Sequence, residues 1–495
     1  MISLQTLIQA LPDRVVLAGG LDRSIAGIQY DSRQVQPGSL FVCVPGFKTD
    51  GHLYAADAVA KGAVALVVER PVTVPDGVTV IQVPDARLAL AGLAACFYGY
   101  PSRRFHLIGV TGTNGKTSTT ILLDAVFRRW GRKTGLLGTI SNRVGGEVIP
   151  ASHTTPESLD LQKLFKLMAD AQTDYVMMEV SSHALSLHRV AAAEFDVGVF
   201  TNLTRDHLDF HRDFQEYREA KGKLFTLLSG GAKAGRKYGV VNKDDPNSEY
   251  FMKTSPVPVL TYSLTQPSDY QATDIVITAK GASFRLKGKD FPPFTLNLTG
   301  RFSVYNGLAA VAVALEEGVP VDIIREALAE LPGVPGRFER VDAGQDFTVV
   351  VDYAHTPDGL ENVLRTAREV CSGRIITVFG CGGDRDRTKR PLMGHVSGRL
   401  SDYTIVTSDN PRTEDPEAII AEIVPGVKEA GGKYEIVVER KAAIQKALTL
   451  AGAGDLVLVA GKGHEDYQII GTKKYPFDDR KVVREILESM KDETK

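Results

Sequence analysis

The chain has 495 residues, of which 43% are hydrophobic and 24% are charged, and its formal net charge is −2. This balance is typical of a globular chain of about three domains, and it gives no overall attraction to nucleic acid or acidic lipid. No uninterrupted apolar run is long enough to span a bilayer, and the N-terminus lacks the pattern of a signal peptide. The four cysteines have no paired spacing. We therefore expect a cytoplasmic protein that binds no nucleic acid and does not insert into a membrane.

Short β-branched runs fill the first block of the chain. The runs at 25–30, 40–44, 63–68 and 78–83 predict strands, and a helix is expected from Ala86 to Tyr98. The stretch YPSRR, which contains Pro101, predicts a linker. We place the first domain at residues 1–100.

Strands and helices alternate in the second block, which we place at residues 101–334. A strand at 105–110 leads through a glycine-rich turn into an amphipathic helix, and further strands are expected at 175–180, 197–202 and 238–242. This order predicts βαβ units and a parallel sheet. A hairpin is expected at 274–288, and a helix at 304–318 closes the block before the Pro- and Gly-rich stretch at 331–339.

The third block, residues 335–495, alternates in the same way. Strands are expected at 347–354, 374–380, 402–408, 434–440 and 455–461. Open parallel sheets bind ligands at the carboxyl ends of their strands, and four of these ends carry charged or hydrogen-bonding groups. The groups are His355, Asp384 with Arg385, Asp409 to Arg412, and Lys462 to Glu465. We expect them to line one pocket, so that Arg412 faces a cleft and not open solvent.

The segment TGTNGKTST, residues 111–119, lies between a predicted strand and a predicted helix. Its glycines allow backbone N–H groups to surround a phosphate, Lys116 supplies charge, and the Thr117 hydroxyl can hold Mg²⁺. The longer GxxxxGK[ST] pattern is not met, because Val110 stands where its first glycine would be. The alternative is an ordinary Gly-rich turn, but the strand, the helix and the Lys-Thr pair favour phosphate binding.

Two further polar segments follow predicted strands. Glu179 ends one strand, where a carboxylate near the phosphate loop suits Mg²⁺; the alternative is a strand-end cap. The segment NLTRDHLDFH, residues 202–211, gathers Asp206, His207, Asp209 and His211. It is either part of the site or a solvated loop, and a zinc site there lacks cysteine partners. By composition alone, Lys221 and Lys223 are ordinary exposed lysines of a helix.

Ten segments occur together in the order found in the Mur ligases. They are GTNGKT, MEVSSHAL, NLTRDHLDFH, EAKGKLF, RFSVYNGLAA, PGRFE, DYAHTPD, FGCGGDRDRTKRPLM, SDNPRTEDP and GKGHE. Nearly the whole chain resembles this family, least of all the first block. The resemblance is greatest to the members that add the third residue of the muramoyl peptide.

The resemblance implies an α/β fold of three domains. They are a small α/β domain for the uridine nucleotide, a central P-loop ATPase-type domain with a parallel sheet, and a C-terminal Rossmann-like domain for the amino acid. The resemblance also implies ATP and Mg²⁺ as cofactors, with UDP-MurNAc-L-Ala-D-Glu and meso-diaminopimelate as substrates. ATP would convert a carboxylate into an acyl phosphate, which the amine of the amino acid attacks. A monomer is the family expectation.

The resemblance assigns roles to single residues. Lys116, Lys221 and His207 would be catalytic, and the metal would be held by Thr117, Glu179, His207 and a carbamate on Lys221. ATP would be bound by Gly112, Thr113, Asn114, Gly115, Lys116, Thr117, Ser118, Asn306, Arg337, Asp352 and His355. The sugar nucleotide and its dipeptide would be bound by Ser32, Thr154, Thr155, Ser181 and Arg189. The amino acid would be bound by Arg385, Asp409, Asn410, Pro411, Arg412, Gly461 and Glu465.

Arg412 decides the expected amino acid. Members that add meso-diaminopimelate resemble one another in a D-N-P-R motif, whereas those that add lysine lack this arginine. A guanidinium can bind the distal carboxylate of diaminopimelate in a bidentate manner, and it would repel the ammonium at the end of lysine. Glu465 would suit the distal ammonium. The alternative for Arg412 is a surface arginine in a turn.

Two departures from the family and three rival functions complete the expectations. Leu187 stands where some relatives carry Gln, and Phe47-Lys48-Thr49 replaces the His-Gln-Ala form of others. The resemblance therefore does not assign the detailed contacts to the uridine and the sugar. The rivals are a lysine-adding member, a folylpolyglutamate synthetase and a catalytically silent nucleotide-binding module. The DNPR run argues against a lysine-adding member. The run GGDRDRTKRP together with GKGHE argues against a folylpolyglutamate synthetase. The complete set of candidate catalytic residues argues against a silent module.

Overall fold

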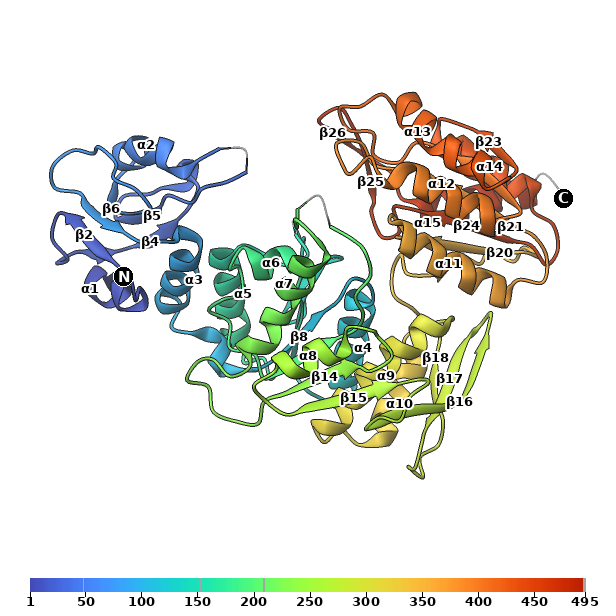
Figure 1. Ribbon diagram of the computed structural model, residues 1–495, viewed down its shortest axis with the longest axis horizontal. Helices are drawn as coiled ribbons and strands as arrows, with labels where there is room; N and C mark the ends of the chain where they lie inside the picture. The colour runs from blue at the N-terminus through green and yellow to red at the C-terminus, as the bar shows by residue number, and fades with distance from the viewer. Residues whose placement is uncertain (48, 152, 208–209, 493–495) are drawn as a thin grey trace.

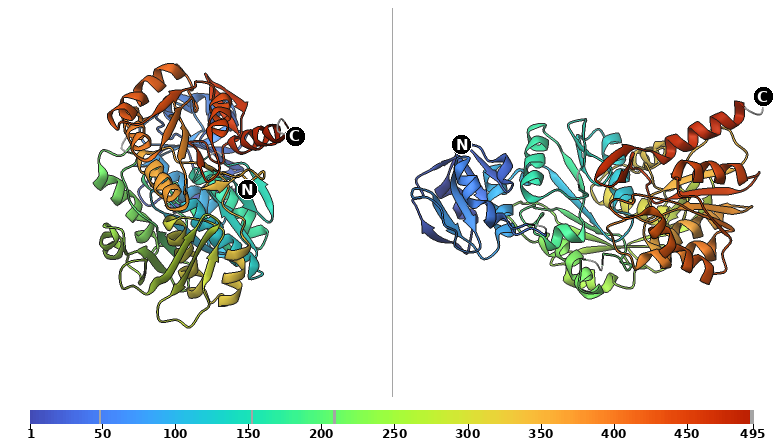
Figure 2. Two further views of the ribbon diagram at one scale, coloured as in Figure 1. Left: turned by 90° about the vertical axis from the view of Figure 1, so that its right-hand side faces the viewer. Right: turned by 90° about the horizontal axis from the view of Figure 1, so that it is seen from above.

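The computed structural model describes residues 1–47, 49–151, 153–207 and 210–492, and it contains three large sheets that follow one another along the chain (Figure 1). The N-terminal part, the central part and the C-terminal part form a row, as both Figure 1 and the view from above in Figure 2 show. The α/β class with three domains is therefore confirmed. Lys48 and Asp209, which the sequence singled out, lie outside the described residues.

The first sheet has five strands in the order β2-β7-β6-β5-β4. Apolar side chains of its strands pack on helix α3, whose first turn is capped by the Asp85 carboxylate accepting from Leu88 N at 2.9 Å. The edge strand β2 and the helix α1 were not predicted, and the run at 25–30 is divided between two strands. The elements of this part are β1 (Ile2–Ser3), α1 (Leu4–Leu7), β2 (Val15–Ala18), β3 (Ser24–Ile25), β4 (Gly27–Gln29), β5 (Ser39–Val42), α2 (Ala55–Ala60), β6 (Ala63–Val68), β7 (Thr79–Gln82) and α3 (Ala86–Phe97).

The central sheet has eleven strands in the order β11-β10-β9-β12-β8-β13-β14-β15-β16-β17-β18. The run from β9 to β16 is parallel; β16 and β17 then form the predicted antiparallel hairpin, and β18 adds a further antiparallel strand. Its strands are β8 (His106–Thr111), β9 (Thr134–Leu137), β10 (Asn142–Val144), β11 (Glu147–Ile149), β12 (Tyr175–Glu179), β13 (Val197–Phe200), β14 (Tyr238–Asn242), β15 (Val259–Ser263), β16 (Tyr270–Thr278), β17 (Gly281–Leu286) and β18 (Phe294–Leu296).

Helices cover both faces of the central sheet, and an apolar core lies on each face. The helices are α4 (Lys116–Arg129), α5 (Ser158–Asp170), α6 (Ser182–Ser186), α7 (Phe214–Leu227), α8 (Ser248–Thr254), α9 (Arg301–Glu316) and α10 (Val321–Glu330). The last of these, α10, was not predicted. Helix α5 also packs against α3, which joins the N-terminal part to the central part.

The third sheet has six strands in the order β19-β20-β24-β21-β22-β23, all parallel except the edge strand β19. The strands are β19 (Glu339–Arg340), β20 (Thr348–Asp352), β21 (Ile375–Phe379), β22 (Tyr403–Val406), β23 (Tyr434–Ile436) and β24 (Leu456–Ala460). The helices are α11 (Pro357–Val370), α12 (Lys389–Leu400), α13 (Pro416–Glu429), α14 (Arg440–Leu450) and α15 (Asp479–Asp492). A hairpin of β25 (Tyr467–Ile470) and β26 (Lys473–Pro476) follows β24.

The parallel order places polar loops at one edge of each sheet. Strand β8 lies between β12 and β13 in the middle of the central sheet, so the phosphate loop, Glu179 and the segment after β13 emerge side by side. Within the described ranges, no helix has both the length and the apolar character needed to cross a membrane.

Candidate functional site

The phosphate loop connects β8 to α4 and is held open by its neighbours. Thr113 N donates to Asn202 O at 2.8 Å, Asn114 N donates to Asn202 Oδ1 at 3.0 Å, and Thr201 Oγ1 donates to Asn114 O at 2.6 Å. Gly112 and Gly115 have positive φ angles of 150° and 87°, which side chains rarely adopt. The N-terminus of α4 therefore faces the loop, as anion binding requires.

Lys116 lies inside this loop. Its Nζ donates to the carbonyls of Gly112 at 3.0 Å and Thr113 at 2.8 Å. Burial lowers the pKa of Lys116, and the carboxylates of Glu179 and Asp206 oppose that shift. Because the Lys116 ammonium is held by carbonyls of a loop whose backbone N–H groups can also bind an anion, it is better placed to bind a phosphate than a carboxylate of the protein.

Glu179 and Thr117 lie together at the ends of neighbouring elements. Thr117 Oγ1 donates to Glu179 Oε2 at 3.0 Å, and Thr139 N donates to Glu179 Oε1 at 2.8 Å. Glu179 is 1% exposed and Thr117 is 5% exposed. Buried hydroxyl and carboxylate oxygens beside a phosphate loop are the ligands that Mg²⁺ prefers.

Lys221 is buried, which corrects the interpretation from composition that it is an exposed lysine. It is 1% exposed, and its Nζ donates to Gly112 O at 2.7 Å. Burial lowers the pKa of Lys221 well below its usual value, and the positive charge of Lys116 adds to this shift. Burial therefore favours the neutral amine more than in a free lysine, whereas Lys223, two residues further along α7, is exposed.

The segment after β13 brings histidine and aromatic rings together. His207 has a φ of 55°, and its backbone N donates to Asp206 Oδ1 at 2.8 Å. The rings of His183 and His207 lie 4.8 Å apart, and Phe210 lies 4.1 Å from His183. Loss of water lowers the pKa of His207, and the charges of Lys116 and Lys221 lower it further, so its imidazole has a free lone pair.

No three His, Cys, Asp or Glu side chains of the described residues gather into a metal-binding cluster. Mg²⁺ usually takes one or two protein carboxylates and completes its shell with water and substrate phosphates.

Residues of the C-terminal part reach the phosphate loop. Asn114 Nδ2 donates to Asp358 Oδ2 at 2.9 Å, and Thr204 Oγ1 donates to the same oxygen at 2.9 Å. Arg337 Nη2 lies 3.3 Å from Thr117 Oγ1, to which it donates. Burial raises the pKa of Asp358. The sequence did not single out Asp358, although its position in the first turn of a helix after Thr356-Pro357 was a usable signal.

The other candidate ATP residues surround this junction. The Asn306 side chain on α9 packs against Gly115, so that a side chain at position 115 would collide with it. The Asp352 carboxylate accepts from Phe338 N at 2.6 Å and from Ala354 N at 2.7 Å. His355 follows it at the end of β20 and is exposed, with Nδ1 2.9 Å from Tyr353 O.

Four of the candidate sugar-peptide residues form one patch beside Glu179. Thr155 Oγ1 donates to Glu179 O at 2.8 Å and accepts from Ser181 N at 3.2 Å. Arg189 Nη1 donates to Thr155 O at 3.1 Å, and the hydroxyls of Thr154 and Thr139 lie 3.0 Å apart. The fifth, Ser32, lies in the N-terminal part, where Lys61 Nζ donates to its carbonyl at 3.2 Å.

The N-terminal part also contacts the segment after β13. The ring of Phe47 meets the ring of Phe210 edge to face at 5.8 Å. Phe47 belongs to the run that departs from the family pattern, so this contact is a feature that the resemblance did not predict.

The strand ends of the third sheet bring together residues that the sequence predicted to bind the amino acid. Asn410 Nδ2 donates to Glu465 Oε2 at 2.9 Å, and Lys462 Nζ lies 3.2 Å from the same oxygen. Burial raises the pKa of Glu465, and Lys462 opposes the shift. Asp409 is 8% exposed, and its Oδ2 accepts no hydrogen bond but lies 3.8 Å from Nη1 of the buried Arg440. The two carboxylates thus lie at these strand ends, each beside a cation of the protein.

Arg412 lies partly buried beside this pocket, and not on an open turn. Its Nη1 donates to Gly383 O at 2.7 Å, and its backbone pairs with the β25–β26 hairpin through Ile469 O at 3.1 Å. Burial lowers the pKa of Arg412, and the charge of Arg385 lowers it further. Two guanidinium groups that repel each other form a site for a carboxylate.

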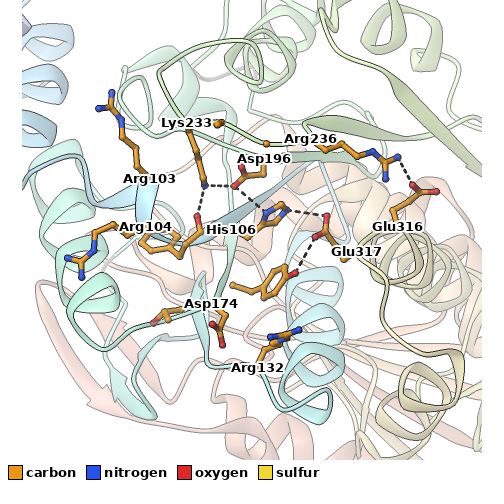
Figure 3. A pocket seen from close by; sticks show the side chains of 15 residues that line it. Arg103, Arg104, His106, Arg132, Asp174, Asp196, Lys233, Arg236, Glu316 and Glu317 are labelled. Carbon is orange, nitrogen blue, oxygen red and sulfur yellow. Dashed lines mark hydrogen bonds and ion pairs between the residues drawn. The ribbon is translucent and has the colours of Figure 1, made fainter.

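A pocket of about 600 Å³ lies at the opposite end of the central sheet, around the first residues of β8 and β12 (Figure 3). Three of its basic groups are already paired: Arg103 Nε lies 2.6 Å from Glu194 Oε1, Arg236 pairs with Glu316 at 2.5 Å, and Lys233 pairs with Asp196. The pocket is separated from the phosphate loop by the length of the sheet, so we do not place the reaction there.

Comparisons with known proteins agree with this arrangement. The chain matches the catalytic domain of the Mur ligase family at 24–98, the Mur ligase middle domain at 110–314 and the Mur ligase glutamate ligase domain at 336–463. It is 51% identical, over 95% of its length and 96% of the relative's, to UDP-N-acetylmuramoyl-L-alanyl-D-glutamate--2,6-diaminopimelate ligase of Syntrophomonas wolfei. The chain belongs to the Mur ligase family.

Three further comparisons concern one sequence and two solved structures that are similar to this Mur ligase. The 2,6-diaminopimelate ligase of Geobacillus thermodenitrificans is 50% identical over 97% of the chain and 98% of the relative. A solved structure titled as a UDP-N-acetylmuramoyl-L-alanyl-D-glutamate--2,6-diaminopimelate ligase has a TM-score of 0.70 at 33% identity and covers 99% of both chains. The MurF ligase of Thermotoga maritima in complex with ADP, at 19% identity and a TM-score of 0.61 over 94% and 98% of the chains, shares the fold.

Proposed function

We propose that this Mur ligase uses ATP to join meso-diaminopimelate to the D-glutamyl γ-carboxylate of UDP-MurNAc-L-Ala-D-Glu. ADP and phosphate are released, and the product is a precursor of peptidoglycan made in the cytoplasm. The observation that carries the proposal is the pair of Arg412 and Arg385 beside the carboxylates of Asp409 and Glu465. The names of the most similar relatives support the same substrates.

The pocket of the third sheet distinguishes the two ends of the amino acid. One end of diaminopimelate supplies the attacking amine. The other end carries a carboxylate, which suits Arg412 and Arg385, and an ammonium, which suits Glu465 and Asp409. Lysine has no distal carboxylate, so its binding would leave the two guanidinium groups facing each other without an anion.

The central sheet handles the phosphates. We assign ATP to Gly112, Thr113, Asn114, Gly115, Lys116, Thr117 and Ser118, and to Asn306, Arg337, Asp352 and His355 around them. Thr117, Glu179 and His207 would hold Mg²⁺, which when bound neutralises charge on the phosphates. Lys116 adds a positive charge from inside the loop.

A carbamate on Lys221 would complete this set. The buried, neutral amine attacks the carbon of CO₂ and loses one proton, which gives an N–COO⁻ group in place of a cation. The low pKa of Lys221 supports this step because only the neutral amine is nucleophilic. Such an anion on Lys221 would add a carboxylate-like ligand to the residues that would hold Mg²⁺.

The reaction follows from these positions. The γ-carboxylate attacks the γ-phosphorus of ATP, the bond to the bridging oxygen breaks, and ADP leaves. The amine of diaminopimelate, after losing a proton, attacks the carbonyl carbon of the acyl phosphate, and the tetrahedral intermediate collapses to an amide and phosphate. Thr154, Thr155, Ser181 and Arg189, with Ser32 across the boundary, would hold the sugar nucleotide so that its carboxylate lies beside Glu179 and the phosphate loop.

We further propose that the domains change near residue 100 and near residue 335, and that the protein works as a monomer. The decisive experiment measures phosphate release with ATP, Mg²⁺ and UDP-MurNAc-L-Ala-D-Glu, with meso-diaminopimelate or L-lysine as the amine. We expect rapid release with diaminopimelate and only residual release with lysine. Release with lysine only would keep the ligase and reject the role of Arg412, whereas release with neither would favour a silent nucleotide-binding protein.

A further inference from the structure

Arg390 is a buried cation next to the amino-acid pocket that none of the roles above includes. It lies on α12 and is 0% exposed. Its Nη1 donates to Glu414 Oε2 at 2.9 Å and to Glu422 Oε2 at 2.8 Å, and its Nη2 donates to Glu414 Oε1 at 2.8 Å and to Gly382 O at 3.3 Å. A buried guanidinium is tolerated only when such acceptors are held in place around it.

These acceptors belong to the two loops that carry Arg385 and Arg412. Gly382 lies in the loop after β21, and Glu414 lies in the loop after β22. Glu414 Oε1 also accepts from Asp384 N at 2.6 Å, and Thr413 Oγ1 donates to Asp384 Oδ1 at 2.8 Å. Arg390 and Glu414 therefore fasten the two loops to each other.

The loops also approach so closely that a side chain would not fit between them. Gly383 N donates to Asn410 O at 2.9 Å, and a Cβ at Gly383 would collide with Pro411 O. The carbonyl of Gly383 is in turn the acceptor for Arg412 Nη1 at 2.7 Å. Because Arg412 has a φ of 52°, its backbone has little freedom to compensate for a shift of this acceptor.

From this chain of contacts we propose that Arg390 is a positioning residue for amino-acid selection, which sets the direction of the Arg412 guanidinium through Glu414 and the Gly382–Gly383 turn without touching a substrate. The inference rests on the proposed function and deepens it. Arg390 matters for the distal carboxylate of the amino acid, and not for ATP or for the sugar nucleotide.

A general stabilising role of Arg390 is the competing explanation, and selectivity separates the two. L-Lysine has the same side chain as meso-diaminopimelate without the distal carboxylate, so it reports the pocket without the Arg412 contact. If the Arg412 guanidinium is no longer held in its orientation, turnover of diaminopimelate falls, whereas the residual turnover of lysine stays the same. A general loss of folded protein lowers both by the same factor.

The experiment compares kcat/KM for the two amino acids at saturating ATP, Mg²⁺ and UDP-MurNAc-L-Ala-D-Glu in the wild type, Arg390→Lys, Arg390→Met and Glu414→Gln. We expect the ratio of diaminopimelate to lysine to fall about tenfold or more in Arg390→Met, mainly through a higher KM for diaminopimelate, with an unchanged KM for ATP. Arg390→Lys keeps the positive charge but not the two-pronged geometry of the guanidinium, so its ratio of diaminopimelate to lysine should lie between those of Arg390→Met and the wild type. Glu414→Gln tests the same link if Arg390→Met does not fold.

The matched control is Arg387→Met. Arg387 pairs with the other oxygen of Glu422, but it is 66% exposed in its side chain and lies outside the link between the loops. The ratio of kcat/KM for diaminopimelate to kcat/KM for lysine should be the same in Arg387→Met as in the wild type. If the wild type turns over diaminopimelate and the Arg390 and Glu414 variants keep the wild-type ratio, this inference is overturned and the proposed function is kept. No turnover of diaminopimelate by the wild type overturns the proposed function and the inference together.

Discussion

Asn114 Nδ2 donates to the carboxylate of Asp358 at 2.9 Å, although the two residues are 244 positions apart in the chain. Asn114 belongs to the phosphate loop of the central sheet, and Asp358 to the first turn of α11 beside the third sheet. Thr204 donates to the same carboxylate oxygen. One half-buried carboxylate thus connects the glycine-rich loop after β8 with the C-terminal part of the chain.

We expect Asp358→Ala to weaken the use of ATP. Removal of the shared acceptor leaves the Asn114 amide and the Thr204 hydroxyl without their partner, so the KM for ATP should rise about tenfold. Phosphate release over a range of ATP concentrations measures this change. Glu361→Ala is the control, because Glu361 lies on the same helix but pairs with Arg365 and Arg399. A similar rise in both variants would assign the effect to the helix and not to the contact.

Arg412→Ala should lose the distal carboxylate contact. A charge-assisted pair of this kind corresponds to roughly a hundredfold in kcat/KM for diaminopimelate, whereas binding of ATP and of the sugar nucleotide should change little. Steady-state kinetics with each substrate varied in turn gives the three values. Arg399→Ala, which removes a half-exposed arginine of α12, serves as the control. Equal losses for all three substrates would make Arg412 a structural residue.

Lys221→Ala should abolish most activity, and a small added carboxylate such as formate should restore part of it. The physical reason is that the carboxylate can enter the space left beside Gly112 O and replace the carbamate. Phosphate release with and without formate measures the rescue. Lys223→Ala, on the exposed side of the same helix, should retain full activity and show no rescue. Full activity of Lys221→Ala would rule out the carbamate.

Glu414 should make stability depend on pH in the acid range. Hydrogen bonds from Arg390 and from Asp384 N lower the pKa of Glu414 from its usual value of 4.5 to about 2. The folded protein therefore binds fewer protons at this site than the unfolded chain between these values, so the stabilisation is complete above about pH 4.5 and is lost as the pH falls toward 2. Urea unfolding at several pH values measures the free energy of unfolding. The wild type should be more stable than Glu414→Gln at pH 7, and this difference should become smaller as the pH falls. Glu417 is exposed, so the difference between the wild type and Glu417→Gln should stay near zero at every pH.

Much of the fold follows from local patterns in the sequence. The β-branched runs before Lys116, Glu179 and Asp409 are strands, since their side chains suit a sheet buried on both faces. Helix α10 and strand β2 were missed for opposite reasons. The helix follows Pro320 directly after another helix, and the side chains of β2 lie exposed at a sheet edge, which removes the apolar signal.

The candidate site was only partly readable. Lys221 is four residues after Tyr217 and four before Phe225, both buried on α7, so the helical period did indicate its burial, while its residue type suggested the contrary. Asp358 carried only a local signal, its place in the first turn of a helix, and Arg390 carried none. Their roles depend on the approach of one loop to another, which a single sequence does not encode locally.

In the proposed function, the phosphate loop and the residues that select the amino acid belong to two sheets with separate apolar cores. Arg385, Arg412 and Glu465 belong to loops of the third sheet, and no strand of that sheet carries Lys116 or Glu179. Substitutions that alter which amine is accepted can therefore accumulate in these loops without disturbing the energy-transducing half of the enzyme. A lineage can in this way change the chemistry of its cell-wall cross-link while it inherits the ATP-dependent step unchanged.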